Sequence, residues 1–320
     1  MNEAQAIERL RKFATDPAAR GLADDVALFD GLVLTHDSIA EGVHFLPGDP
    51  AASVGWKLVT VNLSDLAAKG AEPAAALLSL AIGQDGDWVD AFIGGVEAAC
   101  TSYGLPLIGG DTIALPAAAP RVFGLTAIGR AGPRTPSRAG GQVGDKLWVV
   151  GFFGDSAAGL ALLQENPKAA GLLVEAYRRP VPQLAAGRAL APLANAMMDV
   201  SDGLLLDARR IAEASGCTAD IDLDAVPLSE AFIENRGDSL HSRLFAATGG
   251  DDYALLAALP ADADPLTLPL PSGTSIRCIG TLEAGGESLR LSSSGKPVEL
   301  PEVLGHEHRA NFVPPVAGRA

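Results

Sequence analysis

The chain has 320 residues, of which 48% are hydrophobic and 20% charged, a balance typical of a globular protein rather than a disordered one. At roughly 150 residues per domain, this length predicts two domains, each large enough to bury its own core. The 24 basic and 39 acidic residues leave a formal charge of −15, which argues against a nucleic-acid binder and against an anionic membrane surface as partner. A phosphate substrate is compatible with this charge if cations screen the carboxylates.

The cysteines and the amino-terminal segment favour a cytoplasmic location. Cys100, Cys217 and Cys278 lie far apart and match no zinc-binding spacing, so we expect small buried hydrophobic residues in a reducing compartment. Residues 1–16 form a charged amphipathic stretch without the apolar centre of a secretion signal. Because the sequence has no run of about 18 apolar residues, we expect no membrane-spanning helix.

Hydrophobic periodicity predicts an α+β organisation for the first half of the chain. The expected elements are, in chain order, a helix over residues 3–15, two short strands within 26–37 joined by a turn at Asp30-Gly31, a helix over 51–71, a buried strand over 73–82, a helix over 86–103 closed by Gly104, and strands over 105–112 and 121–131.

Residues 132–145 are rich in Gly, Pro and small polar residues, and we interpret them as the junction between a domain over 1–140 and a second domain over 141–320. The second half begins with a predicted strand at 146–151. Further elements are expected as helices at about 155–165, 168–178, 183–194 and 203–215, and as strands at 218–223, 253–260 and 275–283.

Common nucleotide-binding and protease motifs are absent from the sequence. Instead, short apolar runs repeatedly end in aspartate, a pattern that places carboxylates at the ends of strands. These aspartates are Asp24, Asp25, Asp37, Asp65, Asp111, Asp199, Asp202, Asp251 and Asp252.

Several carboxylates converging on one site repel one another unless cations lie between them. Oxygen ligands without His or Cys clusters favour Mg²⁺ over Zn²⁺, and carboxylate-bound Mg²⁺ usually keeps positions for substrate phosphates. The aspartates taken together therefore predict Mg²⁺-nucleotide chemistry.

Each feature also has a simpler structural explanation. Asp24-Asp25 is compatible with a loop pair or a helix cap, and Asp37 and Asp65 are compatible with a solvated strand end or an N-cap. The glycines of GGDT (109–112) and GGDDY (249–253) suit tight turns, although glycine also lets backbone N–H groups approach a phosphate. His36 and His44, each taken alone, favour a structural role. Only the joint occurrence of the clusters favours the functional interpretation.

The chain resembles the thiamine-monophosphate kinases, a family in the superfamily of aminoimidazole-ribonucleotide synthetases and selenophosphate synthetases. The matching segments are DDVAL (24–28), THDSIAEGVHF (35–45), GWKLVTVNLSDLAAKGAEP (55–73), LIGGDT (107–112), RAGGQVGD (138–145), GDSAAGL (154–160), MDVSDGLLLD (198–207) and GGDDY (249–253). The resemblance implies an enzyme that transfers the γ-phosphoryl group of ATP directly to thiamine monophosphate with several Mg²⁺ ions. It also implies two domains, an α+β domain that pairs with its copy in a homodimer and an α/β domain.

The resemblance further implies which residues form the site. Metal ligands would be Asp25, Thr35, His36, Asp37, Asp65, Asp111, Asp199 and Asp202. ATP would be contacted by Tyr103, Gly110, Asp111, Arg138 and Ser201, and the acceptor by His44, Asp251 and His306.

Three positions depart from the family pattern. His36 stands where the family often has Thr, which matters if the metal contact is made by the side chain and not if it is made by the backbone. Asp251 replaces the usual Glu, which shortens its reach toward the thiamine moiety. His306 replaces an aromatic residue that packs on the substrate ring, and Phe312 is the alternative for that role.

Two other classes of function fit parts of this pattern. A selenophosphate synthetase would carry a reactive Cys near its N-terminus, whereas the first cysteine here is Cys100, and the hydrogenase-maturation relatives end in a cysteine tail, whereas this chain ends VAGRA. A protein that binds Mg²⁺-nucleotide or thiamine phosphate without turnover is disfavoured by the intact set of aspartates. We therefore expect a kinase.

Overall fold

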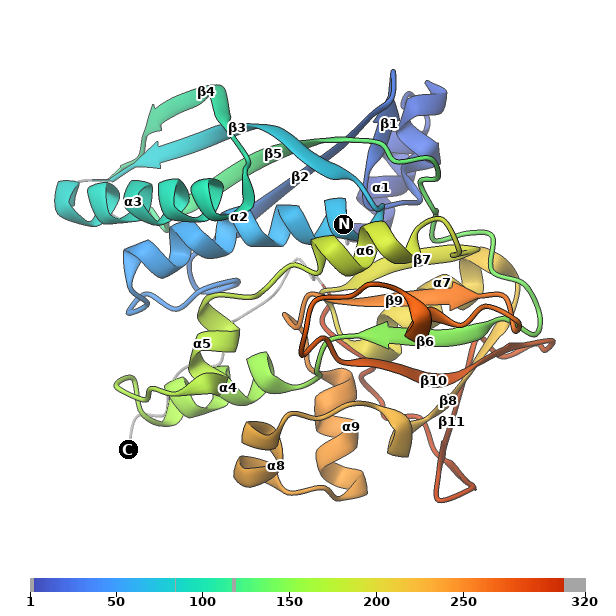
Figure 1. Ribbon diagram of the computed structural model, residues 1–320. Coiled ribbons are helices and arrows are strands. Elements are labelled where there is room, and N and C mark those ends of the chain that lie inside the picture. Colours follow the sequence, from blue (N-terminus) through green and yellow to red (C-terminus); the bar gives the residue numbers. More distant parts are fainter. Residues whose placement is uncertain (1–2, 84, 117–118, 308–320) are drawn as a thin grey trace. The chain divides into compact units, whose positions relative to one another are not determined.

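The computed structural model describes residues 3–83, 85–116 and 119–307 (Figure 1). These residues divide into two compact units. The first takes in residues up to 66, residues 73–130 and Glu307, and the second takes in 67–72 and 131–306. A domain boundary at residue 140 stays a prediction.

A five-stranded sheet in the order β1-β2-β5-β3-β4 forms the frame of the first unit. β1–β2 and β2–β5 are antiparallel, whereas β3–β4 is parallel. The elements are α1 (Glu3–Arg11), η1 (Pro17–Leu22), β1 (Ala27–Phe29), β2 (Leu32–Ala40), α2 (Ala51–Ala68), β3 (Glu72–Ile82), α3 (Gly86–Tyr103), β4 (Leu107–Ala114) and β5 (Val122–Arg130).

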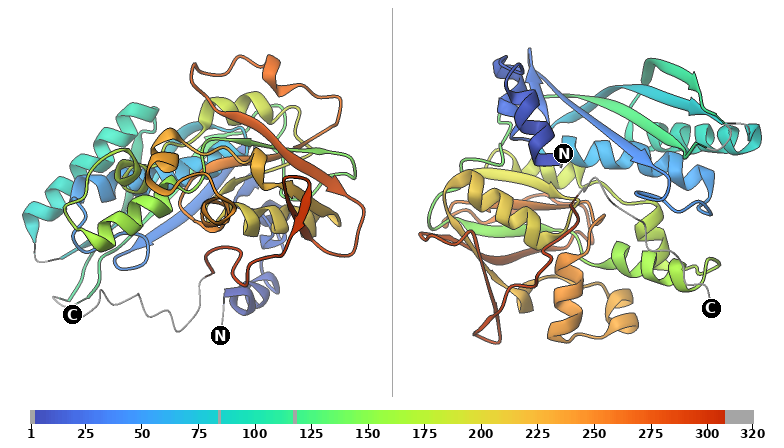
Figure 2. Two further views of the ribbon diagram at one scale, coloured as in Figure 1. Left: turned by 90° about the horizontal axis from the view of Figure 1, so that it is seen from below. Right: turned by 180° about the vertical axis from the view of Figure 1, so that it is seen from behind.

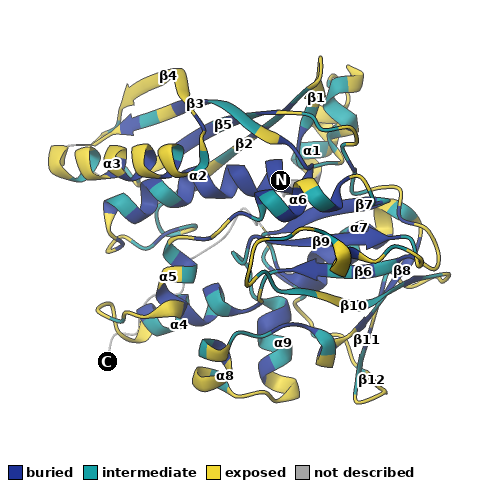
Figure 3. Cartoon of the chain, viewed as in Figure 1, coloured by how far each residue is buried: buried dark blue, intermediate teal, exposed yellow. Residues whose placement is uncertain are grey.

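Glycines allow α2 and α3 to pack closely. A Cβ atom on Gly55 would lie 2.2 Å from the Phe92 carbonyl oxygen, and one on Gly95 would lie 2.0 Å from the Ala52 carbonyl oxygen. Neither helix can therefore carry a larger residue at the crossing without moving apart. α2 is buried along nearly its whole length, and Figure 3 shows this as a dark blue helix.

Local signals in the first half correctly predicted several turns. Asp30 and Gly31 both have positive φ, 50° and 75°, as a tight hairpin between β1 and β2 requires. Gly104 ends α3 in the left-handed conformation with φ 64°. The first helix, however, ends at Arg11 rather than at residue 15.

The predicted strand over 73–82 is confirmed as β3, but the expectation that it is buried was wrong for part of its length. In β3, Ala76, Leu78 and Ala81 are buried, but Leu77 and Ile82 are exposed. β4 is exposed at every residue, as its yellow colour in Figure 3 shows. No helix within the described ranges is long and apolar enough to cross a membrane.

The second unit is built on a seven-stranded sheet in the order β12-β11-β8-β10-β6-β9-β7. Its pairs are antiparallel except for the parallel pair β8–β11. The elements are β6 (Lys146–Val150), α4 (Asp155–Glu165), α5 (Leu172–Arg178), α6 (Leu184–Leu190), β7 (Ala196–Val200), α7 (Leu204–Ser215), β8 (Thr218–Asp222), η2 (Leu223–Ala225), α8 (Glu230–Arg236), α9 (Leu240–Thr248), β9 (Ala254–Leu259), η3 (Pro265–Thr267), β10 (Ile276–Glu283), β11 (Leu289–Ser293) and β12 (Lys296–Val298).

Helix α7 packs on this sheet and fixes the chain that leads into it. Leu205, Ala208 and Ile211 of α7 are fully buried in one cluster with side chains of β6, β7, β8 and β9. Figure 2 shows α7, in yellow, lying across the sheet in the right-hand view. β7 is buried at all five of its residues, so Asp199 is held in a strand with little freedom to move.

Candidate functional site

Three residues of the first unit bring oxygen atoms together. Asp25 lies just before β1, Thr35 lies on β2 and Asp65 lies near the end of α2. The Thr35 hydroxyl donates a hydrogen bond to the Asp65 carboxylate and lies 3.5 Å from the Asp25 carbonyl oxygen. Asp25 and Asp65 each offer a carboxylate oxygen, and these two atoms lie within 4.8 Å of one another. This spacing suits two ligands of one hard cation.

The two neighbours Asp24 and Asp25 differ in their surroundings. Asp24 Oδ2 lies 3.0 Å from Arg20 Nε in an ion pair, and Asp24 Oδ1 accepts a hydrogen bond from the Asp25 backbone N–H. Asp24 therefore has a structural role, which agrees with the interpretation of Asp24-Asp25 as a loop pair for this one residue. Asp25 is the member of the pair that lies beside Asp65.

Asn62 ties α2 to β2 and was missed in the sequence. Its side chain is fully buried, donates to the Leu58 carbonyl oxygen and accepts from the Asp37 backbone N–H at 3.0 Å. The amide thus sets the position of Asp37 relative to the helix that carries Asp65. The only available signal was its place in NLSD, one helical turn before Asp65.

The side chain of His36 lies on the opposite face of β2 from Thr35 and Asp37, because side chains alternate along a strand. Its Nδ1 atom lies 2.9 Å from the Thr126 hydroxyl of β5, and its Nε2 atom lies 3.5 Å from the Ser38 hydroxyl. The imidazole therefore points away from the Thr35 side chain, and whether His36 contacts a metal stays a prediction. Only the backbone of His36 lies next to Thr35 on β2.

The residues expected to contact ATP in the first unit lie on β4 and α3. Asp111 and Gly110 are on β4, the edge strand, and β5 and β3 separate β4 from β2, so roughly 14 Å of sheet lies between Asp111 and Thr35. Gly110 has φ 154°, and a Cβ atom there would lie 1.9 Å from the Leu78 carbonyl oxygen. Tyr103 ends α3 and packs edge-on against Trp56, and burial raises the pKa of its hydroxyl.

His44 lies in the loop after β2 and is held by its backbone and its ring. Its Nδ1 atom accepts from the Ala40 backbone N–H at 3.1 Å. The ammonium group of Lys57, a residue only 1% exposed, donates to the His44 carbonyl oxygen at 2.9 Å. The buried lysine was missed because a lone Lys in an apolar helix gives no sequence signal for its partner.

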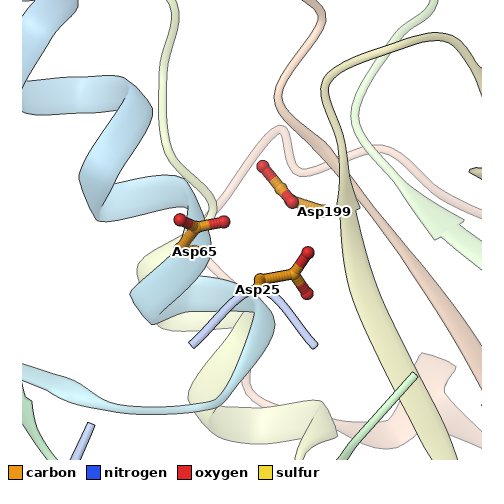
Figure 4. A group of neighbouring side chains, drawn as sticks. All are labelled: Asp25, Asp65 and Asp199. Atoms are coloured by element: carbon orange, nitrogen blue, oxygen red, sulfur yellow. The ribbon is translucent and has the colours of Figure 1, made fainter. Parts of the chain in front are cut away.

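In the second unit, β7 leads directly into the segment that carries Ser201 and Asp202. Asp199 is 3% exposed and lies opposite Leu255 of β9. Gly203, with φ 119°, turns the chain into α7, and a Cβ atom there would lie 2.9 Å from the Thr248 carbonyl oxygen. Figure 4 shows the side chains of Asp25, Asp65 and Asp199 with the elements that carry them.

Asp202 is bound by an arginine that the sequence did not point to. Arg210 Nη1 donates to Asp202 Oδ2 at 2.5 Å and to Asp207 Oδ1 at 2.6 Å. Asp207 is fully buried, and this burial raises the pKa of its carboxyl to about 7, while the nearby Arg210 and Arg138 oppose the shift. Arg138 therefore lies close enough to this group to act on it electrostatically.

The structure brings two residues of the expected acceptor end to the same segment. The Asp251 backbone N–H donates to the Ser201 carbonyl oxygen at 2.7 Å, and the His306 backbone N–H donates to the Asp202 carbonyl oxygen at 2.8 Å. Tyr253 donates its hydroxyl to Asp251 Oδ1 at 3.0 Å. Phe312, the alternative to His306, lies outside the described residues.

Asp252, the neighbour of Asp251, binds the N-terminus of a helix. Both of its carboxylate oxygens accept from the Gly154 backbone N–H, at 3.1 and 2.9 Å, at the start of α4. Burial raises the pKa of Asp252 well above its ordinary value. The GDSAAGL and GGDDY segments are therefore joined by a helix cap.

The chain matches known families along most of its length. Residues 23–131 match the model of the AIR synthase related protein, N-terminal domain, and residues 142–288 match the corresponding C-terminal domain. A curated thiamine-monophosphate kinase of Salmonella typhimurium is 36% identical over 96% of this chain and 97% of the relative. Another from Caulobacter vibrioides is 38% identical over 92% of this chain and 86% of the relative.

Solved structures give the same result. One described as AaThiL complexed with AMPPCP and TMP is 31% identical, has a TM-score of 0.81, and is matched over 95% of this chain and 97% of its own. A thiamine monophosphate kinase from Aquifex aeolicus is 30% identical with a TM-score of 0.78, over 92% of this chain and 96% of its own. The two-domain fold expected from the resemblance is thus confirmed.

Proposed function

Because the chain belongs to the thiamine-monophosphate kinase family of the AIR synthase related proteins, we propose that it transfers the γ-phosphoryl group of ATP to thiamine monophosphate. The products are thiamine diphosphate and ADP. The observation that carries the proposal is the full-length similarity to kinases of this name, together with a similar structure described with AMPPCP and TMP.

The residues present fit a magnesium site. Asp25, Thr35 and Asp65 offer oxygen atoms only, and Asp199 is a buried carboxylate at the end of a strand. Such a donor set suits Mg²⁺ and not Zn²⁺. We propose Asp25, Asp65 and Asp199 as the principal ligands. Further ligands in this proposal are Thr35, Asp37, Asp111, Asp202 and the backbone of His36.

Phosphoryl transfer between two phosphate groups requires positioning and charge neutralisation more than proton transfer. Bound Mg²⁺ ions would neutralise the oxygens of donor and acceptor. The chain itself would orient ATP with Tyr103, Gly110, Asp111, Arg138 and Ser201. No nucleophilic side chain is required, so the transfer proceeds in line without a phosphorylated enzyme.

The acceptor is proposed to bind at His44, Asp251 and His306. Asp251 and His306 are both bonded through their backbones to residues 201–202, which supports a common binding region for these two. Asp251 would meet a polar group of thiamine, and the imidazole of His306 would pack on a ring.

A cytoplasmic homodimer completes the proposal. Strands β3 and β4, at one edge of the sheet in the first unit, expose several large apolar side chains, a feature that favours pairing with a second copy. They are Leu77, Ile82, Leu107, Ile108 and Ile113. Light scattering of the purified protein tests this directly, and a monomer at micromolar concentration contradicts it.

The activity test uses purified protein with ATP, Mg²⁺ and thiamine monophosphate, and separates the products by chromatography. Thiamine diphosphate and ADP are expected in equal amounts, with none after EDTA is added and none when thiamine replaces its monophosphate. Binding of ATP and thiamine monophosphate without product would instead identify a binding protein. ADP formation that depends on selenide would identify the selenophosphate class.

A further inference from the structure

The two-residue segment Ser201-Asp202 holds the expected acceptor residues through its carbonyl groups. The Ser201 carbonyl oxygen accepts from Asp251 N–H, and the Asp202 carbonyl oxygen accepts from His306 N–H. Gly305, next to His306, fits here only as glycine, because a Cβ atom would lie 2.4 Å from the Asp202 carbonyl oxygen. A shift of this segment would therefore move Asp251 and His306 together.

A closed ring of hydrogen bonds fixes this segment to helix α7. Arg210 Nη1 bridges Asp202 Oδ2 and Asp207 Oδ1, at 2.5 and 2.6 Å. Asp207 Oδ2 in turn accepts from the Asp202 backbone N–H at 3.2 Å. Asp202 is thus held through its side chain by Arg210 and through its backbone by Asp207.

We propose that Arg210 is a positioning residue for the acceptor: by bridging Asp202 and Asp207 it fixes segment 201–202, and through it Asp251 and His306. This inference rests on the proposed kinase function. Arg210 itself touches no substrate in this proposal. Its effect is geometric, since displacing a binding group by a fraction of an ångström weakens the contacts made at the far end.

Arg209, the preceding residue, provides a matched control. Its Nε atom lies 3.7 Å from Glu213 Oε1 in a surface pair one turn along the same helix. Arg209→Gln removes the same charge from α7 as Arg210→Gln does, but it leaves the bridge to Asp202 intact. A difference between the two variants therefore reports the bridge and not the net charge.

Arg210→Gln by itself leaves the buried Asp207 without its cationic partner, which can prevent folding. The double variant Asp207→Asn with Arg210→Gln removes both charges and keeps amide groups that can hydrogen-bond to each other. We expect this double variant to fold, as measured by thermal unfolding. The conservative Arg210→Lys should restore part of the wild-type behaviour, because an ammonium group can bridge the carboxylates less rigidly.

The readout is the KM for thiamine monophosphate against the KM for ATP. In the double variant the KM for thiamine monophosphate should rise about tenfold, equivalent to about 1.4 kcal/mol. The KM for ATP should rise by less, because two proposed acceptor residues depend on this segment but only one proposed ATP contact, Ser201, lies in it. Calorimetric titration of thiamine monophosphate into protein with AMPPCP and Mg²⁺ should show the same loss without turnover. Arg209→Gln should match the wild type in both measurements.

Three outcomes would overturn the inference. They are an unchanged acceptor KM in a folded double variant, an equal rise of both KM values, and an Arg209→Gln variant as impaired as Arg210→Gln. If the double variant does not fold, Arg210→Lys is compared with Arg209→Gln. The inference then requires that Arg210→Lys raises the KM for thiamine monophosphate more than the KM for ATP, and that Arg209→Gln changes neither. A wild-type protein that forms no thiamine diphosphate would contradict the proposed function instead, so the two failures are distinct.

Discussion

Asp65 of the first unit and Asp202 of the second both follow a serine, yet their surroundings differ. Asp65 accepts a hydrogen bond from a neutral hydroxyl, that of Thr35, whereas Asp202 accepts from the guanidinium of Arg210. A hydroxyl leaves the carboxylate charge in place for a cation, while a guanidinium neutralises much of it. Both carboxylates are proposed metal ligands, but Arg210 already offsets part of the negative charge of Asp202, whereas no cation offsets that of Asp65 in the hydrogen bond from Thr35.

The largest effect is expected at Asp65. Asp65→Asn should lower kcat by about 1,000-fold, because it removes a ligand charge that no other group of its unit replaces at that position. Circular dichroism and thermal unfolding should show a folded protein, since Asn can still accept the Thr35 hydrogen bond. Asp90→Asn, at an exposed position of α3, serves as the control and should retain activity. A folded Asp65→Asn variant with wild-type turnover would contradict the metal assignment.

A smaller loss is expected at Asp202. Asp202→Asn should lower kcat/KM for the acceptor by about 30-fold, because Arg210 already offsets part of the charge that is removed. The measurement is steady-state kinetics at saturating Mg²⁺, compared with Asp65→Asn under the same conditions. If Asp202→Asn proves the more damaging of the two, the contrast drawn between the two carboxylates is wrong.

At the proposed acceptor site, a substitution is expected to improve the binding of thiamine monophosphate rather than weaken it. Asp251→Glu combined with His306→Trp restores the usual family residues and should lower the KM for thiamine monophosphate about tenfold, with the KM for ATP nearly unchanged. Asp251 has φ 68°, a conformation that Asp tolerates better than Glu, so Asp251→Glu should also lower the melting temperature slightly. The two single variants measured alongside show which change contributes. If neither KM falls, Phe312 is the next residue to test.

The smallest expected signal is that of a phosphorylated enzyme. With γ-labelled ATP and a rapid acid quench, protein-bound label should stay at background during turnover, because in-line transfer needs no covalent intermediate. Protein label that forms and decays as fast as product appears would contradict direct transfer. A parallel reaction without thiamine monophosphate controls for slow adventitious labelling.

Local signals predicted much of the fold but not all of it. The turn at Asp30-Gly31 and the end of α3 at Gly104 follow from backbone conformations that glycine favours. α8 and α9 were missed, although Ser229 and Ser239 are N-caps that accept hydrogen bonds from the backbone N–H of the third residue beyond them. β11 and β12 were missed for another reason, since their stability comes from pairing with distant strands.

The sequence by itself determined the composition of the candidate site, because repeated aspartates after short apolar runs and the near absence of His and Cys ligands specify oxygen chemistry whatever the packing. The expectation that these aspartates end strands was wrong for Asp65, which lies on helix α2. Strand alternation alone could also have separated His36 from Thr35 and Asp37. The partner of Asp24, Arg20, lies only four residues before it, but only the tertiary structure decided the partners of Asp37 and Asp202, which are Asn62 and Arg210. Hydrogen bonds and ion pairs act over about 3 Å, so their members depend on how elements from different parts of the chain pack, which no local pattern encodes.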